Sequence, residues 1–222
     1  MSSLQLATTY LFSTYRPGFQ ARMGIMNEYR DDFVMDENAY LGLWDATCLY
    51  GMIVKYHPIF YLEIGAGYST SVAHQAIKNS RYMTSMSFID PNPRIDISKY
   101  VGASGGCVRK LQWSDVDPIV WEFKKNDIIY IDGSHLLEDD EDVTIFFLGI
   151  LPRLQKGVIV HLHDIFLPEP YPERWKDRGY SEQYALAMAL IYGNRITPLL
   201  ANGYMSGKTN YGIGKSFWFE VR

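Results

Sequence analysis

A glycine turn between an apolar run and a helical pattern is the feature that most constrains how this 222-residue chain can fold. Residues 59–64 form the apolar run, Gly65-Ala66-Gly67 forms the turn, and residues 69–79 have helical periodicity. A strand, a tight glycine turn and a helix in this order open the nucleotide-binding unit of α/β proteins. Gly65 and Gly67 can adopt backbone angles closed to other residues, and they let a ligand lie against the backbone. The pattern therefore predicts a ligand site at this turn.

The residues around the turn narrow the choice of ligand. Thr70 stands where the third glycine of a dinucleotide fingerprint would be, which favours an uncharged ribosyl ligand over a pyrophosphate. Glu63 would repel a phosphate but attract the amino group of an amino-acid moiety. Asp90 ends a second apolar run, where a carboxylate suits bidentate hydrogen bonding to two ribose hydroxyls. An ordinary turn with a solvated aspartate explains fewer of these features.

Composition excludes several other classes of protein. Hydrophobic residues make up 47% of the chain and charged residues 21%, which indicates a globular protein. The net charge is −4 and Lys and Arg do not cluster, so we expect no nucleic-acid partner. No apolar run approaches the ~18 residues that span a membrane. Cys48 and Cys107 have no metal or redox spacing, and the N-terminus lacks a signal-peptide pattern, so a cytoplasmic location is expected.

Apolar runs alternate with helical patterns from residue 58 onward. This alternation predicts a mainly parallel sheet with right-handed crossovers. Residues 1–57 are expected to be helical, with a break at Pro17-Gly18, and to form a cap on a domain spanning residues 58–222. We predict strands near 59–64, 84–90, 106–110, 127–131 and 157–162, and helices near 69–79, 136–151 and 181–193.

Four segments resemble a known family. Residues 62–70 resemble motif I of the class I S-adenosylmethionine-dependent methyltransferases, and Ile89-Asp90-Pro91 resembles their second acidic motif. Residues 127–135 and 157–164 are similar to the fourth and fifth strands of a branch of small methyltransferases with an Asp-Gly-Ser-His signature, close to methyltransferase family 24. The resemblance covers roughly residues 58–222. It implies a Rossmann-like, doubly wound α/β fold, with a mainly parallel seven-stranded sheet whose last strand is antiparallel.

The resemblance also implies a function, namely methyl transfer from S-adenosylmethionine to a small-molecule acceptor, with O-methylation favoured. Two alternatives are a nicotinamide-dependent oxidoreductase and a non-catalytic ligand-binding module on the same fold. The sequence leaves open the acceptor and whether the chain forms a homo-oligomer. The residues expected to contact the cofactor are Glu63, Gly65, Ala66, Gly67, Ser69, Thr70, Asp90, Pro91, Trp113 and Asp132.

Ionisable residues follow two neighbouring strands, and they are the candidates for catalysis. Methyl transfer to a hydroxyl requires a general base, or a metal that lowers the hydroxyl pKa. In one interpretation His135 or His163 is the base and Asp164 orients it. In the other, which follows from the resemblance to metal-dependent O-methyltransferases, Asp132, His163 and Asp164 bind a divalent ion. His163 replaces a carboxylate of those families, and its nitrogen favours manganese, iron or zinc over magnesium. A third reading makes these groups buried hydrogen-bonding partners.

Overall fold

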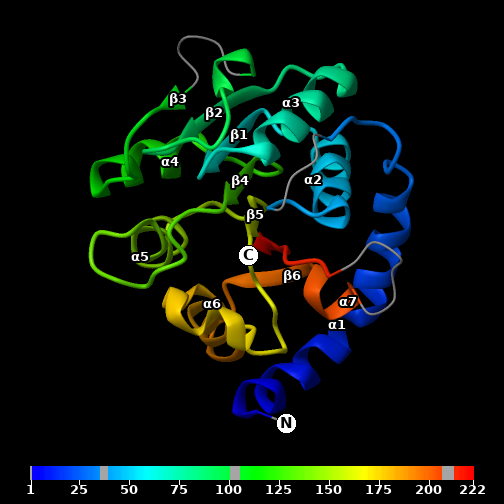
Figure 1. The fold of residues 1–222 in the computed structure, drawn as a ribbon, viewed down its shortest axis with the longest axis vertical. Helices are drawn as coiled ribbons and strands as arrows, with labels where there is room; N and C mark the ends of the chain where they lie inside the picture. The colour runs from blue at the N-terminus through cyan, green and yellow to red at the C-terminus, as the bar shows by residue number, and fades with distance from the viewer. Residues whose placement is uncertain (1, 36–39, 101–105, 207–212) are drawn as a thin grey trace.

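Seven strands form one sheet in the computed structural model, which describes residues 2–35, 40–100, 106–206 and 213–222 (Figure 1). Their order across the sheet is β3-β2-β1-β4-β5-β7-β6, and β7 is antiparallel to both of its neighbours. The predicted mainly parallel sheet with an antiparallel last strand is therefore confirmed. The strands are β1 Phe60–Ile64, β2 Ser85–Ile89, β3 Gly106–Cys107, β4 Ile128–Ile131, β5 Ile159–Leu162, β6 Ile196–Ala201 and β7 Phe217–Val221.

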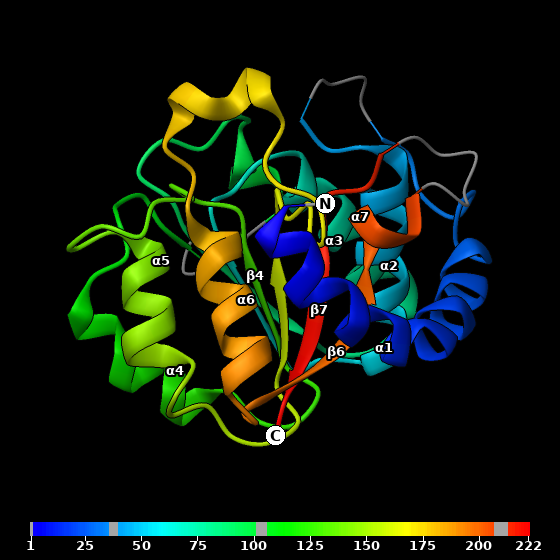
Figure 2. The same cartoon turned by 90° about the horizontal axis from the view of Figure 1, so that it is seen from below.

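Helices cover both faces of the sheet. Figure 2 shows α4, α5 and α6 on one face and α2 and α3 on the other. Helix α1 contacts β6, α2 and α6. The helices are α1 Ser3–Asn27, α2 Leu43–Tyr56, α3 Tyr68–Ser80, α4 Val116–Glu122, α5 Asp142–Ile145, α6 Glu182–Tyr192 and α7 Asn202–Met205, and a π-helix, Phe146–Ile150, continues α5. Of the described residues, none belongs to a helix long and apolar enough to cross a membrane.

The central strands explain why the site lies where it does. All residues of β4 and β5 are buried, as expected for parallel strands covered on both faces. The register pairs Ile64 with Ile131 and Ile131 with Leu162, so the three strands end at the same level. The next residue of each strand, Gly65, Asp132 or His163, continues this alignment: Asp132 N donates to Ile64 O at 2.8 Å and His163 N to Ile131 O at 3.0 Å. The carboxyl edge thus brings together Gly65, Asp132 and His163, three residues of the predicted site.

Three predicted elements differ from those observed. The helix expected from residue 136 begins at Asp142, because the carboxylate of Asp142 accepts hydrogen bonds from Ser134 and holds the preceding residues in a loop. The strand expected at 106–110 comprises only Gly106–Cys107. The break expected at Pro17-Gly18 is absent from α1, since the residues on both sides of Pro17 remain helical and bury Phe12 and Phe19.

The N-terminal segment shares the hydrophobic core of the sheet. Phe12 and Phe19 are fully buried, and the ring of Phe12 stacks on Phe217 of β7 with centroids 5.8 Å apart. The rings of Phe12 and Phe19 also contact the ring of Tyr204 edge to face. The division into a cap of residues 1–57 and a domain of residues 58–222 remains a prediction.

Candidate active site

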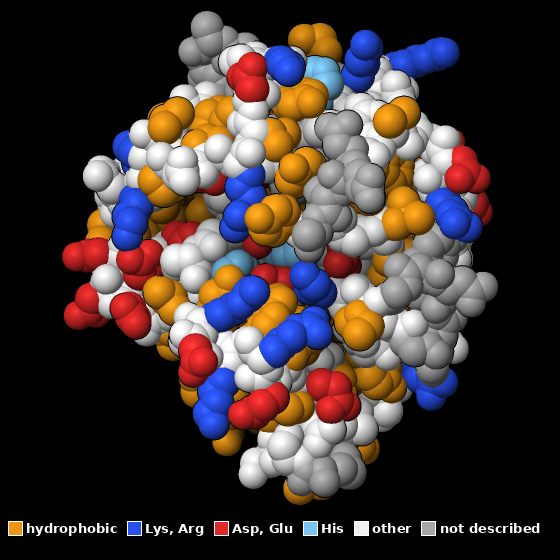
Figure 3. Space-filling view, in the orientation of Figure 1, with side chains coloured by type: hydrophobic (Ala, Val, Ile, Leu, Met, Phe, Trp, Pro, Cys, Tyr) orange, Lys and Arg blue, Asp and Glu red, His pale blue; other side chains and the backbone are white. Residues whose placement is uncertain are grey.

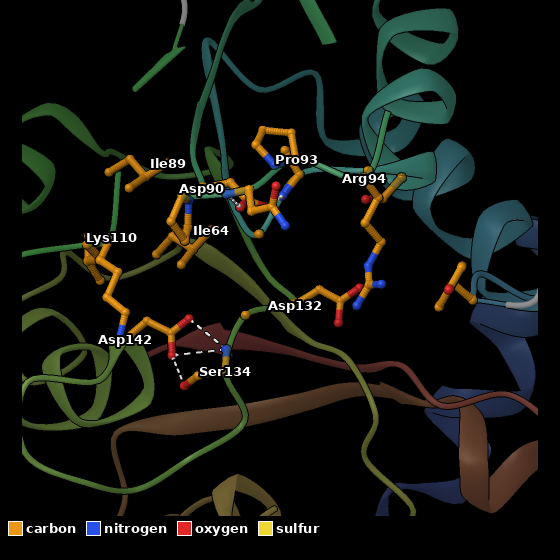
Figure 4. A pocket seen from close by; sticks show the side chains of 18 of the residues that line it. Ile64, Ile89, Asp90, Pro93, Arg94, Lys110, Asp132, Ser134 and Asp142 are labelled. Atoms are coloured by element: carbon orange, nitrogen blue, oxygen red, sulfur yellow. Dashed lines mark hydrogen bonds between the residues drawn. The ribbon is translucent and has the colours of Figure 1, made fainter. Parts of the chain in front are cut away.

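A cavity of about 730 Å³ opens at the carboxyl edge of the sheet, beside the glycine turn (Figure 4). The ends of β1, β2 and β4 supply most of its wall. Tyr40 and Leu41, which precede α2, close one side, and Lys110 and Leu111 close another. Seven of the predicted cofactor contacts line this cavity: Gly65, Ala66, Gly67, Ser69, Asp90, Pro91 and Asp132.

The glycine turn is built by contacts across the sheet edge. Gly65 has a φ of +89°, and a Cβ there would lie 2.0 Å from the carbonyl oxygen of Asp132. Only glycine fits this position without moving β4. Gly67 N donates to the hydroxyl of Thr70 at 3.0 Å, which ties the turn to the first residues of α3.

Asp90 is held in place by the turn. Its Oδ2 accepts a hydrogen bond from Ala66 N and its Oδ1 one from Asn92 N, each at 2.6 Å. These two bonds fix the carboxylate at the cavity wall, and each oxygen keeps acceptor capacity for a ligand hydroxyl. The geometry is compatible with the predicted ribose contact.

Glu63 and Thr70 lie beneath the turn and outside the lining of the cavity. Both are fully buried. Tyr61 donates its hydroxyl proton to Glu63 Oε1 at 2.9 Å, and the Thr70 hydroxyl donates to Oε2. Burial raises the pKa of Glu63 to about 7, despite these hydrogen bonds. A cofactor role for the two residues stays a prediction.

Trp113 is the predicted contact that the structure places away from the cavity. Its ring packs against Gly149, where a Cβ would lie 2.7 Å from Cζ3, and 46% of the residue is exposed. Lys110 and Leu111 line the cavity in its place. The structure does not bring Trp113 to the cavity, because the 3-10 turn Trp113–Asp115 directs the indole toward Gly149, and a cofactor role for Trp113 stays a prediction.

The Asp-Gly-Ser-His segment joins the cavity to a group of ionisable side chains. Gly133 lets Asp142 approach, since a Cβ there would lie 1.6 Å from Asp142 Oδ2. Asp142 in turn accepts hydrogen bonds from Ser134 N and Oγ (Figure 4). His135 follows with a φ of +62°, and Asp164 after β5 has a φ of +54°. Such backbone angles are uncommon outside glycine and concentrate at functional sites.

Two histidines face the same two carboxylates. His135 Nε2 lies 3.3 Å from Asp132 Oδ1 and 3.7 Å from Asp164 Oδ2. His163 Nδ1 lies 3.4 Å from Asp132 Oδ1 and 3.4 Å from Asp164 Oδ1. In Figure 3, histidine side chains are visible between acidic ones near the centre of the face shown. The structure thus brings together Asp132, His135, His163 and Asp164, which we call the His/Asp cluster.

Residues outside the cluster hold its histidines in position. Glu182, at the start of α6, pairs with Nδ1 of His135. Asp45 of α2 lies 3.8 Å from His163 Nε2, and it accepts hydrogen bonds from Asn202 and from the backbone of Lys215. Neither acid is predicted from the sequence, since no local pattern marks either one.

The charges within the cluster reinforce one another. Burial alone would lower the pKa of His135, but Glu182 and Asp132 raise it well above 6.5. Burial likewise opposes charge on His163, yet Asp132, Asp45 and Asp164 raise its pKa well above 6.5. The same histidines overcome the effect of burial on Asp132 and hold its pKa well below 3.8. Each histidine thus favours the charged form of Asp132, and Asp132 favours the charged form of each histidine.

His161 has a structural role. It is fully buried, its ring stacks on Tyr130 with centroids 3.8 Å apart, and its Nε2 lies 2.8 Å from the Ser216 hydroxyl. Burial, with His163 nearby, lowers its pKa well below 6.5. His161 is therefore a neutral core side chain, distinct from the cluster.

Comparison with known proteins identifies the fold. The structure is similar to the O-methyltransferase TomG from Streptomyces achromogenes, involved in tomaymycin synthesis and solved with SAM, at 13% identity and a TM-score of 0.53 over 100% of this chain and 99% of that one. It is also similar to the SAH-bound methyltransferase PaMTH1 from Podospora anserina, at 15% identity and a TM-score of 0.51 over 91% and 88% of the two chains. An O-methyltransferase from Bacillus cereus, solved with SAH, matches at 13% identity and a TM-score of 0.50 over 90% of each chain. A search of curated proteins finds no match.

The sheet order, the glycine turn and the acid after β2 define a protein of the class I methyltransferase fold. A family model described as a methyltransferase domain matches residues 62–165, which run from β1 to the end of the His/Asp cluster. The match to this family model and the similar solved structures agree on a methyltransferase fold for this chain, as its sequence motifs predict.

Proposed function

We propose that this chain transfers the methyl group of S-adenosylmethionine to a hydroxyl oxygen of a small-molecule acceptor. One observation carries the proposal: Asp132 lines the cofactor cavity, and its Oδ1 also lies 3.3 Å from His135 and 3.4 Å from His163. A single side chain thus joins the place for the methyl donor to the groups that can accept a proton. The cofactor-bound O-methyltransferases of similar fold support the choice of donor and acceptor atom.

The reaction is an in-line displacement in which the methyl carbon leaves sulfur as it bonds to the acceptor oxygen. Positioning of the donor and the acceptor supplies most of the rate. The hydroxyl proton must move to a base, and the candidates are His135 Nε2 and His163 Nδ1. The carboxylates that raise the pKa of both histidines make their neutral forms stronger bases but scarcer at neutral pH, so turnover through a histidine base should rise as the pH rises above neutrality.

The same residues fit a divalent metal ion. Asp132, His135 and Asp164 each offer a ligand atom, and these atoms lie within 4.8 Å of one another. Asp164 Oδ1 is buried and makes no hydrogen bond with the described residues, and Lys215 Nζ and His163 Nδ1 each lie 3.4 Å from it. Glu182 engages Nδ1 of His135, as outer carboxylates do for metal-binding histidines. We therefore propose His135, with Asp132 and Asp164, as the first choice of metal ligands. His163, which faces the same two carboxylates, is the second choice of histidine ligand. A bound ion would lower the pKa of the acceptor hydroxyl.

The test measures S-adenosylhomocysteine formed from S-adenosylmethionine with a panel of hydroxylated acceptors. We expect turnover, and a loss of at least about a hundredfold in the His135→Ala and His163→Ala variants. If a metal takes part, chelation abolishes turnover and a divalent ion restores it. Resistance to chelator would assign the proton to a histidine instead.

Calorimetry with S-adenosylmethionine and with NAD separates the other functions. Binding of NAD alone would support an oxidoreductase, and binding of S-adenosylmethionine without turnover of any acceptor would support a ligand-binding module. Asp90→Ala is expected to weaken S-adenosylmethionine binding by about 1.5–3 kcal/mol through lost ribose hydrogen bonds. We place the reaction in the cytoplasm, on the basis of the two free cysteines, Cys48 and Cys107.

A further inference from the structure

Two cations line the cofactor cavity at opposite ends, and only one has a carboxylate partner among the described residues (Figure 4). Lys110 Nζ lies 2.7 Å from Glu141 Oε1. Arg94 forms no ion pair with a described carboxylate, and its guanidinium carbon lies 4.4 Å from the centroid of the Tyr40 ring. A guanidinium that lines a cavity and forms no ion pair with a described carboxylate is suited to binding a planar anion.

The position of Arg94 is fixed by the glycine turn. Its backbone N donates to Ala66 O at 3.3 Å. Its Cβ and Cδ lie 3.7 Å and 3.9 Å from the position of a Cβ on Gly67. The ring of Tyr40, over which the guanidinium lies, stacks on Tyr68 at the start of α3. These contacts hold the side chain across the turn, and Figure 4 shows it extended toward Asp132.

The direction of the cofactor follows from two fixed points. Asp90 is placed to bind the ribose, and the methyl group must face the His/Asp cluster that begins at Asp132. A bound sulfonium would therefore lie on the Asp132 side of the ribose. The amino-acid part, which extends from the sulfur, would lie on that side too, and the adenine would lie toward Lys110 and Leu111, which line the other end of the cavity.

We infer that Arg94 binds the carboxylate of the cofactor's amino-acid part. The inference rests on the proposed function and assigns to that site a specificity residue outside the motifs of the sequence. Arg94 would contact the amino-acid carboxylate, which S-adenosylmethionine and S-adenosylhomocysteine have and nucleoside thioethers without an amino acid lack. Its guanidinium can offer two parallel N–H groups to the carboxylate, a geometry that a lysine cannot reproduce.

The experiment compares two ligands that differ in the amino-acid part. Calorimetry measures the affinities of S-adenosylhomocysteine and 5′-methylthioadenosine for the parent chain, Arg94→Gln, Arg94→Lys and Lys110→Gln. Arg94→Gln should weaken S-adenosylhomocysteine by about ten- to a hundredfold and change 5′-methylthioadenosine by less than about threefold. Arg94→Lys should give an intermediate loss. Lys110→Gln, at the adenine end, should change both affinities by the same factor.

The two ligands also separate the ways in which the inference can fail. Binding of 5′-methylthioadenosine to Arg94→Gln shows that the variant is folded, as expected for an exposed side chain. Unchanged affinity for S-adenosylhomocysteine in Arg94→Gln, or an equal loss for both ligands, would overturn the inference and leave the proposed function intact. A parent chain that binds neither ligand would contradict the proposed function itself.

Discussion

At the scale of single residues, Glu63 combines a position at the end of β1 with complete burial. Its two carboxylate oxygens accept hydrogen bonds from Tyr61 and Thr70, so its side chain connects β1 to α3. Burial raises its pKa from 4.5 to about 7. The side chain therefore keeps its proton in the folded chain at pH values where the unfolded chain has lost it.

This difference predicts a dependence of stability on pH. Below about pH 4.5 both states hold the proton, and between about 4.5 and 7 only the folded state does, so stability falls as the pH rises through this window. The full shift corresponds to about 3 kcal/mol. Glu63→Gln should remove this decline, as measured by urea denaturation at several pH values. Glu122 is an exposed carboxylate on α4, and Glu122→Gln is the control. If the stability of the parent chain and that of Glu63→Gln depend on pH in the same way, the raised pKa of Glu63 would be contradicted.

Some residues of the site are predictable from the sequence and others are not, for a physical reason. Gly65 and Asp90 follow apolar runs at fixed spacing, so the local pattern marks them. Asp45 and Glu182 reach the His/Asp cluster only because α2 and α6 pack beside the ends of β5 and β4, and no local pattern records that packing. Arg94 lacks a signal for the same reason, since its role depends on Tyr40 and on the turn.

At the scale of elements, α1 is a long helix that contains unfavourable residues. Its 25 residues include Pro17, which donates no backbone hydrogen bond, and the glycines Gly18 and Gly24. The sequence therefore suggests a break that the structure lacks. Burial of Phe12 and Phe19 on either side of Pro17 stabilises a continuous helix, because tertiary packing outweighs intrinsic propensity.

Gly24 offers a direct test of this account. It is exposed within α1, and apart from its chain neighbours and the backbone of its own helix, no heavy atom of the described residues lies within 4 Å of the position that its Cβ would occupy. Gly24→Ala should stabilise the chain by about 0.5–1 kcal/mol, because alanine loses less backbone entropy in a helix. Thermal unfolding measures the effect. Gly51→Ala is the contrasting variant, since its Cβ would lie 2.4 Å from the sulfur of Met26, and we expect it to destabilise. Destabilisation by Gly24→Ala would show that α1 is not helical at that residue.

At the scale of the whole molecule, the N-terminal helix is part of one core with the sheet. The ring of Phe12 contacts Phe19, Tyr204 and Phe217, which come from three elements. Alternating strands and helices make a mainly parallel sheet predictable, since right-handed crossovers leave few arrangements. The location of α1 against the sheet was not predictable in the same way. Its apolar residues indicate that one face is buried, but not which surface covers that face.

The shared core predicts how the molecule responds to a cavity at Phe12. Phe12→Ala should destabilise the whole chain by about 3–5 kcal/mol. The cofactor cavity has no lining residue from α1, so the affinity of the folded variant for S-adenosylhomocysteine should remain that of the parent. Urea denaturation and calorimetry measure the two effects. Loss of acceptor turnover without loss of stability would instead favour a separate cap formed by residues 1–57.

The place of β7 between β5 and β6 has a consequence for synthesis on the ribosome. Strand β6 is made before β7, yet it pairs with the sheet only through β7, so it has no partner strand until Phe217–Val221 have emerged. Helix α1 is made before β6 and packs on it as well as on α2, so the contact of α1 with the completed sheet must wait for the same event. Phe12 therefore lacks its ring partner Phe217 while the chain between them is translated, which is an interval in which a nascent chain is open to chaperones and to aggregation.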